Sequence, residues 1–203
     1  MSRLSLDSVH QRVYPIVDLL VSRPPLIGTL FINHSKDQTY LRTAEVITLY
    51  VAVLPLEAAA SEPNRWILVL RTSKQTTATV ELKQADPLGN TVVCCSDGPR
   101  LLETGELEGC VKNWAFEVQK GSSLRDWLDR LVKTGLTRYR LVGGLGSRWW
   151  MDCVLRQLSS FVGQLHELND MGIWIRLAWD ENGKPVYPGM MQTLAKGTWL
   201  EME

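Results

Sequence analysis

The sequence is poor in the residues that most often build metal and thiol sites. It has four cysteines and three histidines among 203 residues, and no two cysteines have the CxxC spacing of a zinc or redox motif. This scarcity argues against a structural zinc site and against a disulfide framework. We therefore expect reduced thiols, no metal and no other cofactor.

Net charge and long apolar runs are also absent. Lys and Arg total 22 and Asp and Glu total 22, so no net charge attracts the chain to nucleic acid or to an anionic membrane surface. The longest apolar stretches, such as residues 46–56, are far shorter than a membrane span, and the N-terminus lacks the layout of a signal peptide. We expect a cytoplasmic protein with no nucleic-acid partner and no membrane span.

Tryptophan is the residue that is present in excess, with eight copies against three phenylalanines. Its large apolar face and single N–H donor suit either core packing or a pocket for an apolar ligand. The chain is 45% hydrophobic and 22% charged, which is typical of a globular protein. We expect one domain over residues 1–203, with an N-terminal helix and arm at 1–43 and an α+β core at 44–203.

Hydrophobic periodicity predicts strands in the first part of the core and helices in the second. The segment 6–20 has helical spacing, whereas 26–43 has no clear period and suggests an irregular arm with one short strand. Strands are expected at 44–56, 65–71, 76–82, 91–95, 114–118, 139–142, 173–179 and 196–199. Helices are expected at 124–132, capped by Ser122 or Ser123, and from the N-cap Ser147 to about Asp170. The pattern predicts an α+β fold in which two main helices pack on a mostly antiparallel sheet.

The strongest local motif is GGLGSRWW, from Gly143 to Trp150. A glycine-rich turn before a helix leaves backbone N–H groups that favour a negative charge, although the same residues suit an ordinary capped helix. Ser147 could act as a nucleophile only with a nearby base. His166 would lie about 28 Å further along the same predicted helix, which leaves His10 or His34.

Three arginines are further candidates. Arg65 and Arg71 border an expected strand, and Arg148 follows Ser147. A guanidinium can hold a carboxylate or carbonyl by paired hydrogen bonds, whereas most arginines of a chain serve solubility.

Several short motifs resemble those of a fungal family of small proteins of unknown function, in which they read Asn-His-Trp, Gly-Cys-Arg-x-Trp and Gly-Thr-Phe. The resemblance covers residues 44–203 and rests on Asn64-Arg65-Trp66, Arg138-Tyr139-Arg140-Leu141, Gly146-Ser147-Arg148-Trp149-Trp150, Pro188 and Lys196-Gly197-Thr198-Trp199. It implies a fold similar to circularly permuted papain-like thiol hydrolases, where a helix N-terminus and a His activate a Cys. Arg65 replaces that His and Ser147 replaces that Cys, so the resemblance implies that thiol chemistry is lost.

Members of that family resemble proteins encoded beside natural-product pathways. A ring closure needs an apolar pocket and a polarised carbonyl rather than a nucleophile. The resemblance therefore implies a cofactor-independent cyclase of fungal secondary metabolism, with a Diels–Alderase acting on a terpenoid or polyketide as one form. In this hypothesis the catalytic residues are Arg65 and Ser147, and the substrate-binding residues are Trp66, Arg71, Arg148, Trp149 and Trp150.

Two alternatives stay open. One is a hydrolase or acyltransferase that uses Ser147 or a cysteine, and the other is a non-catalytic protein that binds an apolar ligand. The cyclase and the binding-protein hypotheses both predict a small apolar compound as the partner. A homo-oligomer, in which the partner is a second copy of the chain, also stays open.

Overall fold

The computed structural model describes residues 28–55, 64–163, 165–186 and 193–200. The helix expected at 6–20 lies outside these residues. In chain order the elements are β1 (Leu30–Asn33), α1 (Gln38–Thr43), β2 (Thr48–Val53), β3 (Trp66–Arg71), β4 (Thr77–Gln84), β5 (Thr91–Asp97), β6 (Lys112–Glu117), α2 (Leu124–Lys133), β7 (Tyr139–Arg140), α3 (Ser147–Leu158), the 3-10 helix η1 (Ser159–Phe161), α4 (Leu165–Trp174) and β8 (Thr198–Trp199). No helix in these ranges is long and apolar enough to cross a membrane.

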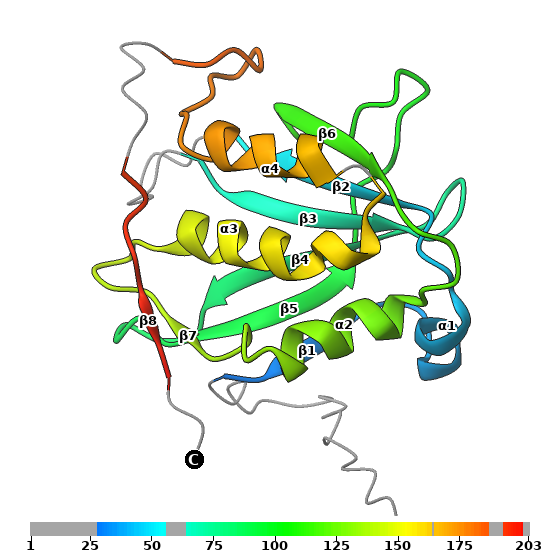
Figure 1. Ribbon diagram of the computed structural model, residues 1–203, viewed down its shortest axis with the longest axis horizontal. Helices are drawn as coiled ribbons and strands as arrows, with labels where there is room; N and C mark the ends of the chain where they lie inside the picture. The colour runs from blue at the N-terminus through cyan, green and yellow to red at the C-terminus, as the bar shows by residue number, and fades with distance from the viewer. Residues whose placement is uncertain (1–27, 56–63, 164, 187–192, 201–203) are drawn as a thin grey trace, which may run out of the picture.

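Six strands form one sheet in the order β1-β5-β4-β3-β2-β6, and β7 and β8 form a separate pair. Every neighbouring pair in the large sheet is antiparallel except β1 and β5, which are parallel. Helices α2, α3 and α4 lie on one face of this sheet (Figure 1). The α+β class and the mostly antiparallel sheet predicted from the sequence are confirmed.

The central strands are apolar on both sides because both faces of the sheet are covered. Along β3, Trp66, Leu68 and Leu70 pack in the main core under the helices. Ile67 and Val69 point to the other face, where Leu101, Leu107 and Cys110 from the loop between β5 and β6 pack against them. This two-sided burial explains why the strand appears in the sequence as a continuous apolar run.

Helix α2 begins as the sequence predicts. Ser123 is its N-cap, the Asp126 backbone N–H donates to the Ser123 hydroxyl at 3.3 Å, and the Ser123 N–H donates to the Asp126 carboxylate at 2.8 Å. This reciprocal pair is a capping box. The buried stripe of the helix includes Trp127, Leu128 and Leu131.

The prediction of a single long helix from Ser147 to about Asp170 is wrong, because the chain forms α3, η1 and α4 instead. The Ser159 hydroxyl donates to the Arg156 carbonyl at 2.8 Å, which competes with continuation of the helix. Val162 then bridges to Val118, just after β6, and the Gly163 N–H donates to the Glu117 carbonyl at 3.1 Å. The helix is therefore interrupted where its backbone pairs with the sheet edge.

Two further expectations are corrected at the ends of these helices. The strand expected at 173–179 is instead the last turn of α4 followed by a backbone turn, with the Ile175 N–H donating to the Met171 carbonyl. Gly146, rather than Ser147, is the N-cap of α3. Gly146 has φ +120°, and a Cβ there would lie 2.8 Å from the backbone nitrogen of Gly197, so only glycine fits this position.

The segment 26–43, expected to be an irregular arm with one short strand, contains one strand and one helix. Strand β1 pairs with β5 and so belongs to the main sheet. Helix α1 begins at the N-cap Asp37, whose carboxylate accepts the Tyr40 N–H at 2.8 Å. The sequence analysis missed α1 because a helix of 6 residues is too short for a hydrophobic period to emerge.

Candidate functional site

Two of the sequence motifs hold the same piece of backbone, the turn at residues 175–179. Asn64 donates from Nδ2 to the Trp179 carbonyl at 3.1 Å and accepts the Trp179 N–H at Oδ1 at 2.7 Å. Arg148 donates from Nη2 to the Leu177 carbonyl. Asn64 and Arg148 are 1% and 3% exposed. The motif before β3 and the motif that opens α3 therefore meet at this turn.

The sequence placed Asn64 in a motif but predicted no role for it, whereas both residues that follow it were predicted as site residues. The available signal was an asparagine immediately before a buried strand. Its side-chain amide has both donors and an acceptor, so it can satisfy a neighbouring backbone segment on its own.

The turn held in this way completes a group of four tryptophans, which we call the tryptophan cluster and define as Trp66, Trp114, Trp174 and Trp179. The Trp114 ring centroid lies 5.7 Å from that of Trp66, 6.3 Å from that of Trp174 and 5.2 Å from that of Trp179. These spacings are within the range of favourable aromatic pairs. Trp66 and Trp179 are 3% exposed, whereas Trp174 is 37% exposed, so the cluster runs from the core to the surface.

Trp66 has an unusual feature within this cluster, because its indole N–H is buried and donates no hydrogen bond to any residue that the structure describes. An unpaired buried donor costs about 1–3 kcal/mol, so such a group in a folded protein calls for an explanation. Trp179 differs, since its indole N–H reaches the Trp174 carbonyl at 3.4 Å. The cluster thus contains aromatic faces together with one N–H available to an acceptor.

The N-terminus of α3, which carries Ser147, is closed by two other segments. The Tyr139 hydroxyl donates to the Gly146 carbonyl at 3.1 Å and accepts the Gly197 N–H at 2.5 Å. A Cβ on Gly197 would lie 2.2 Å from the Arg140 carbonyl oxygen. The two glycine-containing motifs at Gly146 and Gly197 are therefore explained by close backbone packing at this helix end.

The two tryptophans after Arg148 lie apart from the tryptophan cluster in their contacts. Trp149 is half-buried, and the Lys196 ammonium lies 4.7 Å from its ring centroid, a cation–π contact. Trp150 is 1% exposed and donates from its indole N–H to the Leu136 carbonyl at 2.7 Å. Trp150 is thus part of the main core.

Arg65 lies on the other side of the sheet from α3. Its Nε is 3.6 Å from the carboxylate of Glu81, which also pairs with Lys83 at 2.7 Å. On β4, Val80 and Leu82 lie on either side of Glu81 in the sequence and pack under the helices. Because side chains alternate along a strand, the Glu81 side chain points to the opposite face of the sheet. The structure therefore does not bring Arg65 and Ser147 together, and Arg71 lies at the far end of β3 from Arg65.

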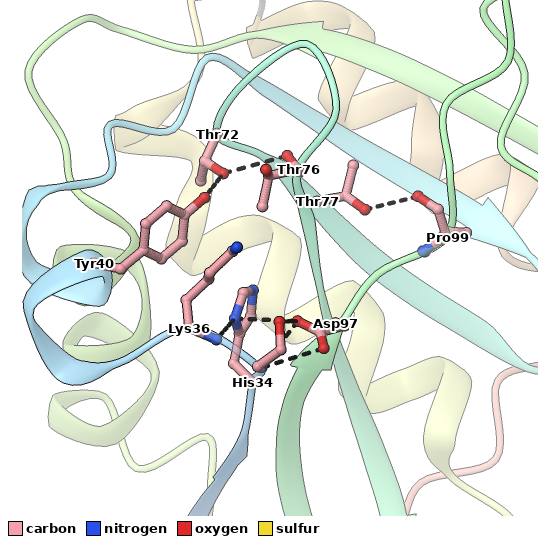
Figure 2. Close-up of polar contacts among 9 residues, drawn as sticks. His34, Lys36, Tyr40, Thr72, Thr76, Thr77, Asp97 and Pro99 are labelled. Carbon is pink, nitrogen blue, oxygen red and sulfur yellow. Dashed lines mark hydrogen bonds and ion pairs between the residues drawn. The ribbon is translucent and has the colours of Figure 1, made fainter.

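His34 is also too distant to serve Ser147. It follows β1 and lies 3.2 Å from the carboxylate of Asp97, the last residue of β5 (Figure 2). Tyr139, which bonds the start of α3, instead accepts a hydrogen bond from Thr91, the first residue of β5. His34 and Tyr139 therefore contact opposite ends of β5, whose 7 residues span about 20 Å. His10, the other base considered for Ser147, lies outside the described residues.

The cysteines offer little thiolate character. Burial raises the pKa of Cys95 to about 12 and that of Cys110 to about 11. Burial also raises the pKa of Cys94 and of Cys153. Because the thiolate is the nucleophile and the metal ligand, this environment opposes both roles. Within the described ranges, no three His, Cys, Asp or Glu side chains gather in a way that could hold a metal ion.

These thiols are expected to resist alkylation in the folded protein. At pH 7.5, iodoacetamide should modify all four cysteines of the urea-unfolded chain well before it modifies any in the native chain, because burial keeps them protonated and covered. Mass spectrometry of timed samples measures this difference. Rapid labelling of a single native cysteine would instead restore the hypothesis of a cysteine-dependent hydrolase.

The environment of His34 predicts a loss of stability in acid. Burial lowers the pKa of His34 and nearby Lys36 lowers it further, against the carboxylate of Asp97 and the Thr77 carbonyl, which raise it. The folded state therefore binds a proton less readily than the unfolded state. The stability that neutral His34 contributes is fully present above the pKa of the unfolded state. It is lost as the pH falls from that value through the lower pKa of the folded state. The urea midpoint should accordingly decrease between pH 7.5 and pH 5.5.

The control for this prediction is a second histidine. His34→Asn keeps an acceptor for the Lys36 N–H, which donates to Nδ1 at 3.1 Å, but removes the titrating group. His34→Asn should flatten the pH dependence, whereas His166→Asn should not, since the His166 side chain is 82% exposed. Equal pH dependence in His34→Asn and the native chain would disprove the assignment.

Comparison with known protein families gives a match over most of the chain. A family model with the description Domain of unknown function (DUF7770) matches residues 49–200, a range that includes Asn64, Arg148 and all four members of the tryptophan cluster. No curated protein and no solved structure matches the chain.

Proposed function

The chain belongs to the DUF7770 family, and we propose that it binds a small apolar compound at the tryptophan cluster without a covalent bond. The observation that carries this proposal is the unpaired, buried indole N–H of Trp66 within stacked aromatic rings. Stacked tryptophan faces favour flat or unsaturated apolar ligands. A free donor among them favours a ligand with an oxygen acceptor, because pairing would remove the cost of the buried N–H.

The partly exposed Trp174 is the side of the cluster from which a ligand would approach. Asn64 and Arg148 act as positioning residues, since they fix the turn that carries Trp179. The ligand class that we propose is a carbonyl-bearing polyketide or terpenoid. This choice comes from the resemblance of the sequence motifs to a fungal family associated with natural-product pathways.

A cofactor-independent cyclase, including a Diels–Alderase, is the second candidate at the same cluster. The observation that favours it is again the Trp66 N–H, since a donor aimed at a carbonyl could polarise it during ring closure. In this version Trp66 takes the polarising role first assigned to Arg65, because Arg65 pairs with Glu81 on the opposite face of the sheet.

The binding proposal is tested with two ligands that differ in one carbonyl, 2-acetylnaphthalene and 2-ethylnaphthalene. Equilibrium dialysis should give tighter binding of the ketone by about 2- to 12-fold, the contribution of one neutral hydrogen bond. Trp66→Phe should remove this preference, because phenylalanine keeps the apolar packing but has no N–H. Trp174→Ala should weaken both ligands.

Trp127→Phe is the matched control. Trp127 is as deeply buried as Trp66, but its N–H donates to the Ser122 hydroxyl at 3.0 Å, so its removal should leave the ketone preference intact. Absence of binding of both ligands, or an unchanged preference in Trp66→Phe, would refute the proposed site.

The cyclase candidate is tested by incubating the protein with an extract of fungal polyketide and terpenoid intermediates, followed by mass spectrometry. A product of unchanged mass and altered retention time, absent with Trp66→Phe, supports ring closure. A compound retained but unchanged supports binding alone, and addition of the mass of water supports the hydrolase alternative.

A further inference from the structure

A hollow of about 310 Å³ lies between α3 and α4, and none of its lining residues belongs to the tryptophan cluster. It is lined by Asp152, Leu155, Arg156, Leu168, Asn169 and Gly172. The residues from α3 recur at positions i, i+3 and i+4, which places them on one face of that helix.

The chemically unusual group in this hollow is the carboxylate of Asp152. Asp152 is only 4% exposed, and a buried carboxylate requires a positive partner. That partner is Arg156, whose Nε lies 3.0 Å from Oδ2 and whose Nη2 lies 3.4 Å from Oδ1 of Asp152. The hollow thus contains a buried negative charge, on Asp152, that is neutralised by Arg156 from the same lining.

Arg156 can be exchanged for another cation. Its side chain is 69% exposed and reaches Asp152 from the rim of the hollow, so its guanidinium can move fully into water when another group takes its place. A second cation at Asp152 keeps the buried carboxylate neutralised, whereas leaving Asp152 without any cation costs much more.

The rest of the lining leaves room for such a replacement. Gly172 has no side chain, and a Cβ there would lie in tight contact with Asp152, 3.3 Å from Oδ1, so only glycine leaves this carboxylate oxygen uncovered on the α4 side. Leu155 and Leu168 also line the hollow but are only 3% and 4% exposed, so most of the surface offered to a ligand is polar. These surroundings match a small amine or guanidine.

We propose that the hollow between α3 and α4 binds a small organic cation, which pairs with Asp152 in place of Arg156. Arg156 occupies the site in the free protein and competes with the ligand. Asp152 supplies the counter-ion, Gly172 leaves its carboxylate uncovered on the α4 side, and Asn169 adds a polar group to the lining.

The test uses the full chain with benzylamine, which is cationic at pH 7, and with neutral benzyl alcohol. Calorimetric titration should detect benzylamine but not the alcohol. Arg156→Ala should tighten benzylamine binding, and if Arg156 covers Asp152 for about nine-tenths of the time the gain is about tenfold. Asp152→Asn should abolish binding, and Gly172→Ala should weaken it by narrowing the approach.

Helix α2 offers the matched control. Arg125 and Asp129 form an ion pair of the same spacing with an Nε–Oδ1 distance of 2.8 Å, outside the hollow. Arg125→Ala should leave benzylamine binding unchanged. Arg156→Ala leaves Asp152 without a cation and should lower stability, so benzylamine, which restores a cation, should raise the Tm of Arg156→Ala more than that of the native chain. If Asp152→Asn fails to fold, this difference and the effect of Gly172→Ala still decide the proposal.

Three outcomes would overturn the proposal. Benzylamine binding that is unchanged or weaker in Arg156→Ala would show that Arg156 is not a competitor. Binding that survives in a folded Asp152→Asn chain would place the cation elsewhere. Binding of inorganic phosphate that is lost in Arg156→Ala, without binding of benzylamine, would make the hollow an anion site.

Discussion

Replacement of Trp150 by alanine is expected to lower the free energy of unfolding by about 4 kcal/mol, the cost of removing a large aromatic side chain from a packed core. Trp150 is 1% exposed, and its N–H donates to the Leu136 carbonyl at 2.7 Å. Alanine would leave both a cavity and an unpaired carbonyl. Equilibrium unfolding in guanidinium chloride, followed by circular dichroism, measures the loss.

Two comparisons separate packing from surface effects. Trp150→Phe keeps most of the apolar contact and should cost about 1–3 kcal/mol, mainly for the carbonyl left unpaired. Trp174→Ala should cost less than Trp150→Ala, because Trp174 is 37% exposed. A native unfolding midpoint for Trp150→Ala would contradict the core assignment and restore Trp150 as a candidate ligand contact.

Asn64→Ala should have the second-largest effect, a loss of about 3 kcal/mol. The substitution removes the partners of the Trp179 N–H and carbonyl, and also a hydrogen bond from Nδ2 to the Leu54 carbonyl at 3.3 Å. Buried polar groups left without partners cost about 1–3 kcal/mol each. For a chain of this size the loss corresponds to a decrease in Tm of about 10 °C, which calorimetry can measure.

An asparagine of strand β6 gives the control for this substitution. Asn113 also bridges backbone groups, accepting the Leu107 N–H at 3.2 Å and donating to the Gly105 carbonyl at 3.4 Å, but it is only half-buried. Asn113→Ala should cost about 1 kcal/mol. Asn64→Ala should also shift tryptophan emission to longer wavelength as Trp179 becomes exposed, and an unchanged spectrum with unchanged Tm would refute its positioning role.

The elements that sequence reasoning predicted correctly are those determined by local chemistry. Strands β3 and β4 follow from β-branched and apolar residues on either side of a short turn. Helix α2 follows from Ser123 and Asp126, because both halves of its capping box lie within four residues of each other. In each case the pattern and the structural cause occupy the same stretch of chain.

Helix α1 was missed because it is short, whereas the other errors concern residues that contact partners far apart in the chain. The alternation in 173–179 resembles a strand, but Trp179 is held as part of a turn by Asn64, 115 positions earlier. The interruption after α3 depends on pairing of Val162 with Val118. The hydrophobic periodicity of a short segment does not indicate contacts with residues so far away in the sequence.

The same limit applies to the candidate site. The sequence identified Trp66 as a candidate ligand contact, but its neighbours Trp114, Trp174 and Trp179 come from three other elements or turns. Their meeting depends on strand β2 lying between β3 and β6. Arg65 was grouped with Ser147 because the resemblance places them at the positions of a catalytic His and Cys. Strand alternation instead places Arg65 on the opposite face of the sheet.

The closure of α3 by Gly197 has a consequence for synthesis of the chain on the ribosome. Ser147 opens the helix, yet the Gly197 N–H that bonds Tyr139 beside it is added fifty residues later. Strand β7, which contacts Asn90 and Thr91 earlier in the chain, likewise lacks its strand partner until Thr198 and Trp199 emerge. The main sheet can pair while translation continues, whereas this helix end acquires its final contacts only after residues 197–199 have left the exit tunnel. Stalled or shortened chains lacking these residues would therefore present Tyr139, which is 0% exposed in the native protein, to cellular quality control.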